Sequence, residues 1–143
     1  MRHRWQASIV SFALLVTASA CAAKASPLTT VTVCGTAFAI PAQMPPTGSG
    51  PVTLMALPCT QGAGLANLIP ETYRRYIQLP VSRPTEGVWV PFDQSTQERM
   101  QADYRRLWDT GRLDDMTIAV TDYMFPNGVI GKFVTYTLHE RRP

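Results

Sequence analysis

Residues 95–139 read STQERMQADYRRLWDTGRLDDMTIAVTDYMFPNGVIGKFVTYTLH, and the periodicity of this stretch changes at Gly111. Before Gly111, apolar side chains recur at the spacing of one helical face. After it, apolar and polar residues alternate over 116–121 and again over 134–139, which is the spacing of strands. Pro126-Asn127-Gly128 between the two runs has the composition of a turn. The stretch therefore predicts a helix followed by an antiparallel hairpin.

The predicted helix carries start and stop signals of its own. Ser95 and Glu98 have the spacing of a capping box, in which each side chain accepts a hydrogen bond from a backbone N–H at the helix start. Gly111 is a natural stop. Four residues form the apolar face: Met100, Tyr104, Leu107 and Trp108. We expect this face to lie in the core with Trp108 as its anchor, and Asp103 to lie off it.

The upstream half of the chain has no charged residue between positions 25 and 70. Residues 30–33 alternate like a short strand, and residues 51–57 have the composition of another strand, which Pro58 ends. Because this half is too apolar for a disordered linker, we expect it to pack against the rest of the chain. Residues 71–77 predict a short helix. A strand, two helices and a hairpin indicate an α+β domain with helices on one face of a small sheet.

The first 25 residues have the order of an export signal. Arg2 and Arg4 are followed by the apolar run 9–16 and then by small residues. That order predicts a signal peptide, removed at or shortly after Ala20. Cys21 leaves a second route open, in which a lipoprotein signal makes this cysteine the lipid-bearing N-terminus.

The chain has three cysteines. If Cys21 leaves with the signal or is lipidated, Cys34 and Cys59 remain, either as a disulfide formed after export or as two buried thiols. Neither a Cys-x-x-Cys motif nor a histidine cluster occurs, so we expect no metal site.

Charge and chemistry exclude several classes of function. From Ser26 onward ten basic and ten acidic residues balance, so no basic surface for nucleic acid is expected. The two histidines are His3, in the signal, and His139, on the outward side of a strand. Asp114 and Asp115 are adjacent and would point to opposite faces of an extended segment, which does not suit an acid–base pair. We expect neither an enzyme nor a bound cofactor.

Two motifs resemble the POTRA domains of BamA-like bacterial outer-membrane protein assembly factors. The first runs Leu107-Trp108-Asp109-Thr110-Gly111-Arg112-Leu113-Asp114-Asp115-Met116 and is similar to the family's Leu-x-x-x-Gly-x-Phe-x-Asp-Val pattern, with Leu113 and Met116 at the Phe and Val positions. The second, Glu140-Arg141-Arg142-Pro143, is similar to the Glu-Arg-Pro exit of the family's last strand.

The resemblance implies a β-α-α-β-β order and a three-stranded mixed sheet covered on one face by two helices. Together with the export signal and the composition of the upstream half, it divides the chain into a signal peptide (1–25), an uncharged Pro/Gly-rich arm (26–50) and a POTRA-like domain (51–143). It implies a periplasmic location at the outer membrane, with unfolded β-barrel proteins and accessory assembly lipoproteins as partners. Family members continue into more repeats and a membrane-inserted barrel. This sequence ends after one repeat, so it is either a fragment or a freestanding module.

The physics of sheet edges indicates where such a domain would bind. If the last strand is central, the preceding strand is an edge, and its backbone can pair with an incoming extended peptide. The predicted binding residues are Thr117, Ile118, Ala119, Val120 and Thr121. Ala119 alternates away from Ile118 and Val120, which makes Ala119→Pro the expected way to block the edge without unfolding the domain. The alternative is a small exported or lipidated structural protein that binds no client.

Overall fold

The computed structural model describes residues 29–61 and 71–141. The predicted signal peptide, Cys21, and the last two residues of the Glu-Arg-Arg-Pro motif lie outside the described residues. The elements, in chain order, are β1 (Thr30–Val33), β2 (Thr36–Ala39), β3 (Val52–Gln61), α1 (Glu71–Arg74), a 3-10 turn (Pro84–Glu86), α2 (Gln94–Trp108), β4 (Leu113–Met124) and β5 (Ile130–Glu140). None of the helices in these residues is long and apolar enough to cross a membrane.

Strands β3, β5 and β4 form one mixed sheet in that order. The last strand, β5, is central: it runs parallel to β3 and antiparallel to β4. The predicted hairpin is therefore β4–β5, and Gly128 in its turn has the positive φ that favours glycine. The α+β class and the three-stranded mixed sheet agree with expectation. β3 continues past Pro58 to Gln61, because an edge strand tolerates a proline whose nitrogen faces away from the neighbouring strand.

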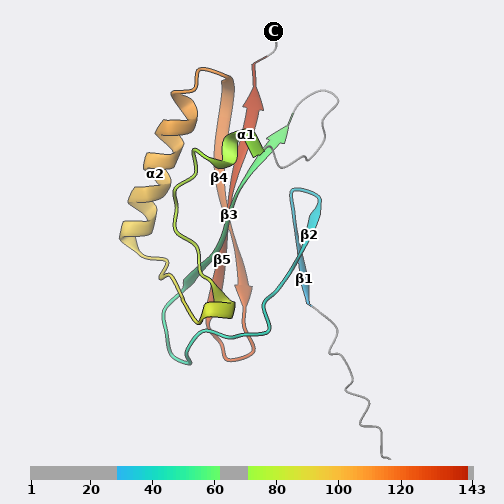
Figure 1. Ribbon diagram of the computed structural model, residues 1–143, viewed down its shortest axis with the longest axis vertical. Helices are drawn as coiled ribbons and strands as arrows, with labels where there is room; N and C mark the ends of the chain where they lie inside the picture. Colours follow the sequence, from blue (N-terminus) through green and yellow to red (C-terminus); the bar gives the residue numbers. More distant parts are fainter. Residues whose placement is uncertain (1–28, 62–70, 142–143) are drawn as a thin grey trace, which may run out of the picture.

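Alternate residues of β5 point to opposite faces of the sheet, and each face is covered by a different part of the chain. Val134, Tyr136 and Leu138 pack in a cluster that includes residues of α1 and α2. Phe133 packs in a second cluster with residues of the β1–β2 hairpin. In Figure 1, α2 and the hairpin lie on opposite sides of the sheet. The two helices cover one face, as expected, and the hairpin adds a cover on the other.

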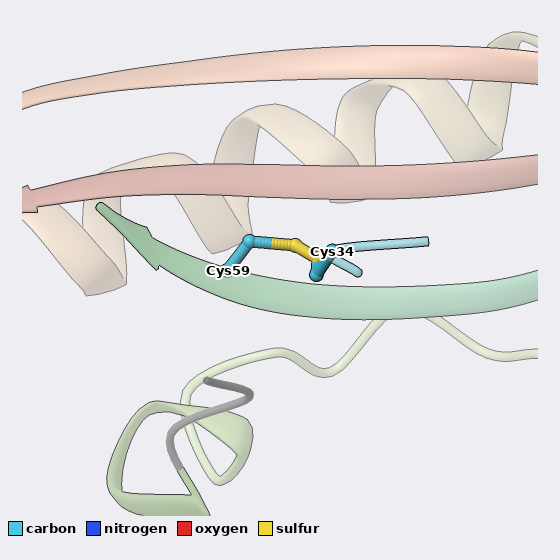
Figure 2. Close-up of a disulfide and its surroundings, with 2 residues drawn as sticks. All are labelled: Cys34 and Cys59. Atoms are coloured by element: carbon cyan, nitrogen blue, oxygen red, sulfur yellow. A yellow bond between two sulfur atoms is a disulfide. The ribbon is translucent and has the colours of Figure 1, made fainter. Parts of the chain in front are cut away.

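The β1–β2 hairpin is amphipathic and covalently attached. β1 falls in the predicted stretch, while β2 was not expected. Cys34 and Gly35 form the turn with positive φ values of 52° and 71°, which is the geometry of a two-residue hairpin turn. Cys34 forms a disulfide with Cys59 of β3, with their Cα atoms 5.9 Å apart. Figure 2 shows this bond on the sheet face opposite α2.

Both helices differ in part from the prediction. The first helix ends at Arg74, and single turns continue to Ile77. The start of α2 is capped by Asp93 and Thr96, so the predicted capping box of Ser95 and Glu98 is wrong. The Asp93 carboxylate accepts from the Thr96 N–H, and the Thr96 hydroxyl accepts from the Asp93 N–H. Hydrogen bonds from Ser95 and Thr96 lower the pKa of Asp93.

The buried face of α2 is not the one expected. Its buried residues are Thr96, Met100, Asp103 and Leu107, at helical spacing. Trp108 is 42% exposed and Tyr104 is 36% exposed, so the prediction of Trp108 as the core anchor is wrong. The helix is rotated because Asp103, fully buried, accepts hydrogen bonds from the Gln78 and Leu79 N–H groups.

Tyrosines complete the polar contacts of this core. The hydroxyl of Tyr136 donates to Asp103 at 3.0 Å, and burial together with the Asp103 charge raises the pKa of Tyr136 above its ordinary range. The hydroxyl of Tyr73 donates to Glu140 at 2.7 Å. Burial and then Glu140 raise the pKa of Tyr73 to about 12, so this hydroxyl stays protonated and keeps donating at neutral pH.

Candidate functional site

The two edges of the sheet differ in whether another segment of the chain bonds to their backbone groups. At the outer edge of β3, Thr53 N–H donates to Val90 O and Ser82 N–H donates to Thr53 O. Next to them, Phe92 N–H donates to Pro51 O. The loop between α1 and α2 therefore covers the start of β3. β4 forms the other edge along its twelve residues.

The pairing of β4 with β5 determines which backbone groups face outward. Phe125 N–H donates to Val129 O at the hairpin end, so this pair is a hydrogen-bonded one. The register continues without a shift from Asp115 to Met124. Because hydrogen-bonded and non-bonded pairs alternate in antiparallel sheets, odd-numbered β4 residues bond to β5. Even-numbered residues direct their N–H and C=O groups outward.

The N-terminal end of this outward row is capped. The Asp115 carboxylate accepts from the Met116 N–H at 2.8 Å, as expected for an N–H that faces away from β5. Ile118, Val120, Asp122 and Met124 follow. Within residues 29–61 and 71–141, no hydrogen bond joins their outward backbone groups to another segment. The result is a row of four residues that can pair with an added strand.

The five predicted residues divide into two sets by this geometry. Ile118 and Val120 present their backbone groups outward, whereas the backbone groups of Thr117, Ala119 and Thr121 bond to β5. Ala119→Pro would therefore remove a bond inside the sheet, contrary to the expectation from sequence. The side chains also differ from expectation: Ile118 is half-buried and Val120 is 40% exposed.

An open groove lies between α2 and β4. Its lining combines β4 side chains with residues of α2, of the preceding loop and of β5: Ile118, Val120, Asp122, Gln97, Met100, Gln101, Phe92 and Lys132. Gln97 and Gln101 lie on one stripe of α2, and this stripe continues to Tyr104 and Trp108 at helical spacing. The rings of Tyr104 and Trp108 stack with their centroids 6.3 Å apart. The groove thus runs beside the unpaired backbone row.

One ion pair stands at the end of the groove. Lys132 Nζ lies 2.7 Å from Asp122 Oδ1 and 5.6 Å from the ring centroid of Phe92. Asp122 is the one acidic residue in the open part of the outward row, and this lysine offsets its charge. An incoming strand therefore meets a row with little net charge.

Sequence reasoning missed the α2 side of this site. The available signal was the 4-3-4 spacing of Gln97, Gln101, Tyr104 and Trp108. The two aromatic residues made the core the simpler interpretation for that stripe.

Trp108→Ala is accordingly expected to change the free energy of unfolding by less than about 1 kcal/mol, because the side chain lies outside the core and is 42% exposed. The neighbouring Leu107 is fully buried, and Leu107→Ala should cost about 2–5 kcal/mol. Urea denaturation of both variants is the measurement. Equal losses for the two would contradict the orientation of α2.

Asp114 and Asp115 each have a partner near the start of β4. Asp114 pairs with Arg141 at 3.2 Å, and Asp115 bonds the Met116 N–H. In the part of the chain that the structure describes, no three His, Cys, Asp or Glu residues are grouped to hold a metal ion.

Comparisons with known proteins give one structural similarity. No protein-family model matches the chain, and no curated protein matches it. Among solved structures, the chain is similar to POTRA1-3 of the periplasmic domain of Omp85 from Anabaena, with a TM-score of 0.42 and 17% sequence identity. The similar region covers 65% of this chain and 35% of that chain, so it spans about a third of that solved chain.

Proposed function

We propose that this domain is a periplasmic binding module of the outer membrane that adds extended segments of unfolded β-barrel proteins to the β4 edge. The observation that carries the proposal is the unpaired backbone row at Ile118, Val120, Asp122 and Met124, placed beside an open groove. Main-chain pairing of this kind tolerates many sequences, which suits a binder of many clients. The sequence resemblance to POTRA domains supports the class of client and an accessory lipoprotein as a second partner.

The two sides of the added strand meet different surroundings. Side chains that point toward α2 enter the groove, where they contact apolar residues such as Met100 and Val120. Side chains that point the other way lie beside the exposed Thr117, Ala119 and Thr121. A segment that alternates apolar and polar residues satisfies both sides. Strands of membrane-inserted barrels alternate in this way.

Val120→Pro is expected to weaken binding of an alternating ten-residue barrel-strand peptide by at least about tenfold, while the domain stays folded. Proline removes one outward N–H and places its ring where the peptide backbone would lie. The measurement is fluorescence anisotropy of a labelled peptide, with circular dichroism to follow folding.

Val120→Ala is the matched control, because it shortens the same side chain and keeps the N–H. It should lose less affinity than the proline variant. A folded Val120→Pro domain that binds the peptide as well as the wild type would contradict this edge as the binding site. Absence of peptide binding by the wild type would favour a structural envelope protein without clients.

A further inference from the structure

Apart from the charge of Asp122, the β4 edge lacks the devices that commonly protect exposed strands. Proteins prevent edge-to-edge pairing with lysine, proline, bulges or short strands. β4 has twelve residues, contains no lysine or proline, and keeps a regular register with β5 from Asp115 to Met124. Its register shift and its acidic pair lie at the start, at or before Asp115. The remaining part is a long regular edge with exposed apolar side chains at Val120 and Met124.

The outward row is also complementary to itself. In an antiparallel pair, outward-facing residues must lie opposite outward-facing residues. A two-fold axis through Val120 meets this condition: Val120 lies opposite Val120 of the second copy, and Ile118 lies opposite its Asp122. The same axis keeps both α2 helices on one face of the combined sheet. Each groove then faces the groove of the other copy.

Charge disfavours a register centred on Asp122. Asp122 is the only charged residue from Met116 to Met124. An axis at Val120 separates the two Asp122 residues by four positions, about 14 Å along the strand, which exceeds the screening length of about 8 Å at physiological salt. An axis at Asp122 would place the two carboxylates directly opposite each other. Lys132 of each copy further offsets its own Asp122 at 2.7 Å.

We propose that two copies of this chain pair through their β4 strands, antiparallel about Val120, and that the pairing occupies the edge when no client is bound. The pairing itself follows from the geometry of the edge. Only its regulatory consequence, competition between the second copy and a client, rests on the proposed function. A client strand and a second copy use the same outward groups, so they exclude each other.

The first test is sedimentation equilibrium across the micromolar to millimolar range. The wild type should show a concentration-dependent dimer. Val120→Lys places two like charges opposite each other at the axis and should weaken the dimer by about tenfold or more. Thr32→Lys adds the same charge on the exposed side of the hairpin and should leave the dimer unchanged. A wild type that stays monomeric throughout overturns the proposal.

The second test fixes the register by oxidative cross-linking in a Cys21→Ser background. A cysteine at position 120 lies opposite its own copy, with Cα atoms about 5.5 Å apart, within disulfide range. A cysteine at position 119 lies opposite position 121 and is out of range of its copy. Val120→Cys should therefore cross-link rapidly and Ala119→Cys slowly. The reverse order, or equal rates, overturns the Val120 axis.

Peptide titration separates this inference from the proposed function. If both hold, the barrel-strand peptide dissociates the dimer, and its apparent affinity falls as protein concentration rises. Dimerisation without peptide binding would support the β4–β4 pairing and contradict the proposed binding of clients. Peptide binding by a protein that remains monomeric would support the proposed function and contradict the pairing of two copies. Peptide bound to an intact dimer would show that the two do not share the edge, and would overturn the competition.

Discussion

Asp103→Ala is expected to lower the free energy of unfolding by about 3–5 kcal/mol, because several donors lose their buried acceptor at about 1–3 kcal/mol each. The Asp103 carboxylate is fully buried and receives hydrogen bonds from Gln78 N–H at 2.9 Å, Leu79 N–H at 3.1 Å and Tyr136 hydroxyl at 3.0 Å. Arg106 forms an ion pair with the same group. Alanine would leave all four donors without this acceptor, inside or next to the core.

Equilibrium urea denaturation followed by tryptophan fluorescence measures this loss. Asp109→Ala removes an exposed carboxylate from the end of the same helix and should cost far less. Tyr136→Phe removes a single donor and should fall between the two. A loss below about 1 kcal/mol for Asp103→Ala would show that Asp103 is not the polar centre of this core.

Replacing Cys34 and Cys59 together with serine is expected to cost about 3–4 kcal/mol. The disulfide closes a loop over a sequence separation of 25, and the chain-entropy model assigns a stabilisation of that size to it. A two-stranded hairpin is marginally stable by itself, so the β1–β2 hairpin should be the part that loosens first.

Hydrogen exchange with and without reductant locates this effect. Amides of β1 and β2 should lose protection in the reduced protein, while those of β5 should keep most of theirs. The matched control is the double-serine variant, on which reductant should have no effect. Equal protection of the hairpin in oxidised and reduced wild type would contradict its dependence on the disulfide.

The elements with strong local signals could be predicted from the sequence. The switch from helical to strand spacing at Gly111 and the Pro-Asn-Gly turn gave the hairpin, and β1 followed from simple alternation. Local signals did not predict the orientation of a side chain where residues distant in sequence determine it. Aspartate is a residue type usually found at the surface. The burial of Asp103 becomes favourable only through hydrogen bonds from other parts of the chain, which come from Gln78, Leu79 and Tyr136.

The same reason explains the error at Trp108. Once Asp103 faces the core, the helix turns Trp108 and Tyr104 toward solvent, where they stack on each other. At the helix start, Asp93 and Thr96 have the same capping chemistry as Ser95 and Glu98, and short-range preferences do not separate the two pairs.

The candidate site also has a part that the sequence predicts and a part that it does not. Sequence periodicity placed residues 117–121 on a strand, and the strand order puts that strand at the edge. Which residues face outward could not be predicted, because it depends on the hydrogen-bonding phase set at Phe125 and Val129. A phase shifted by one residue would exchange the free and the bonded backbone groups, and it would also move every β4 side chain to the other face of the sheet.

The parallel contact between β3 and β5 determines the order in which the domain can assemble. Val52 pairs with Gly131 and Gln61 with His139, so β3 acquires its sheet neighbour only after residues 130–140 have been made. Contacts so distant in sequence form slowly, whereas the β1–β2 and β4–β5 hairpins are local. Cys34 and Cys59 both precede α1, so their cross-link can form on a nascent chain that still lacks its central strand. Oxidation then holds residues 34–59 in a closed loop before β5 is available.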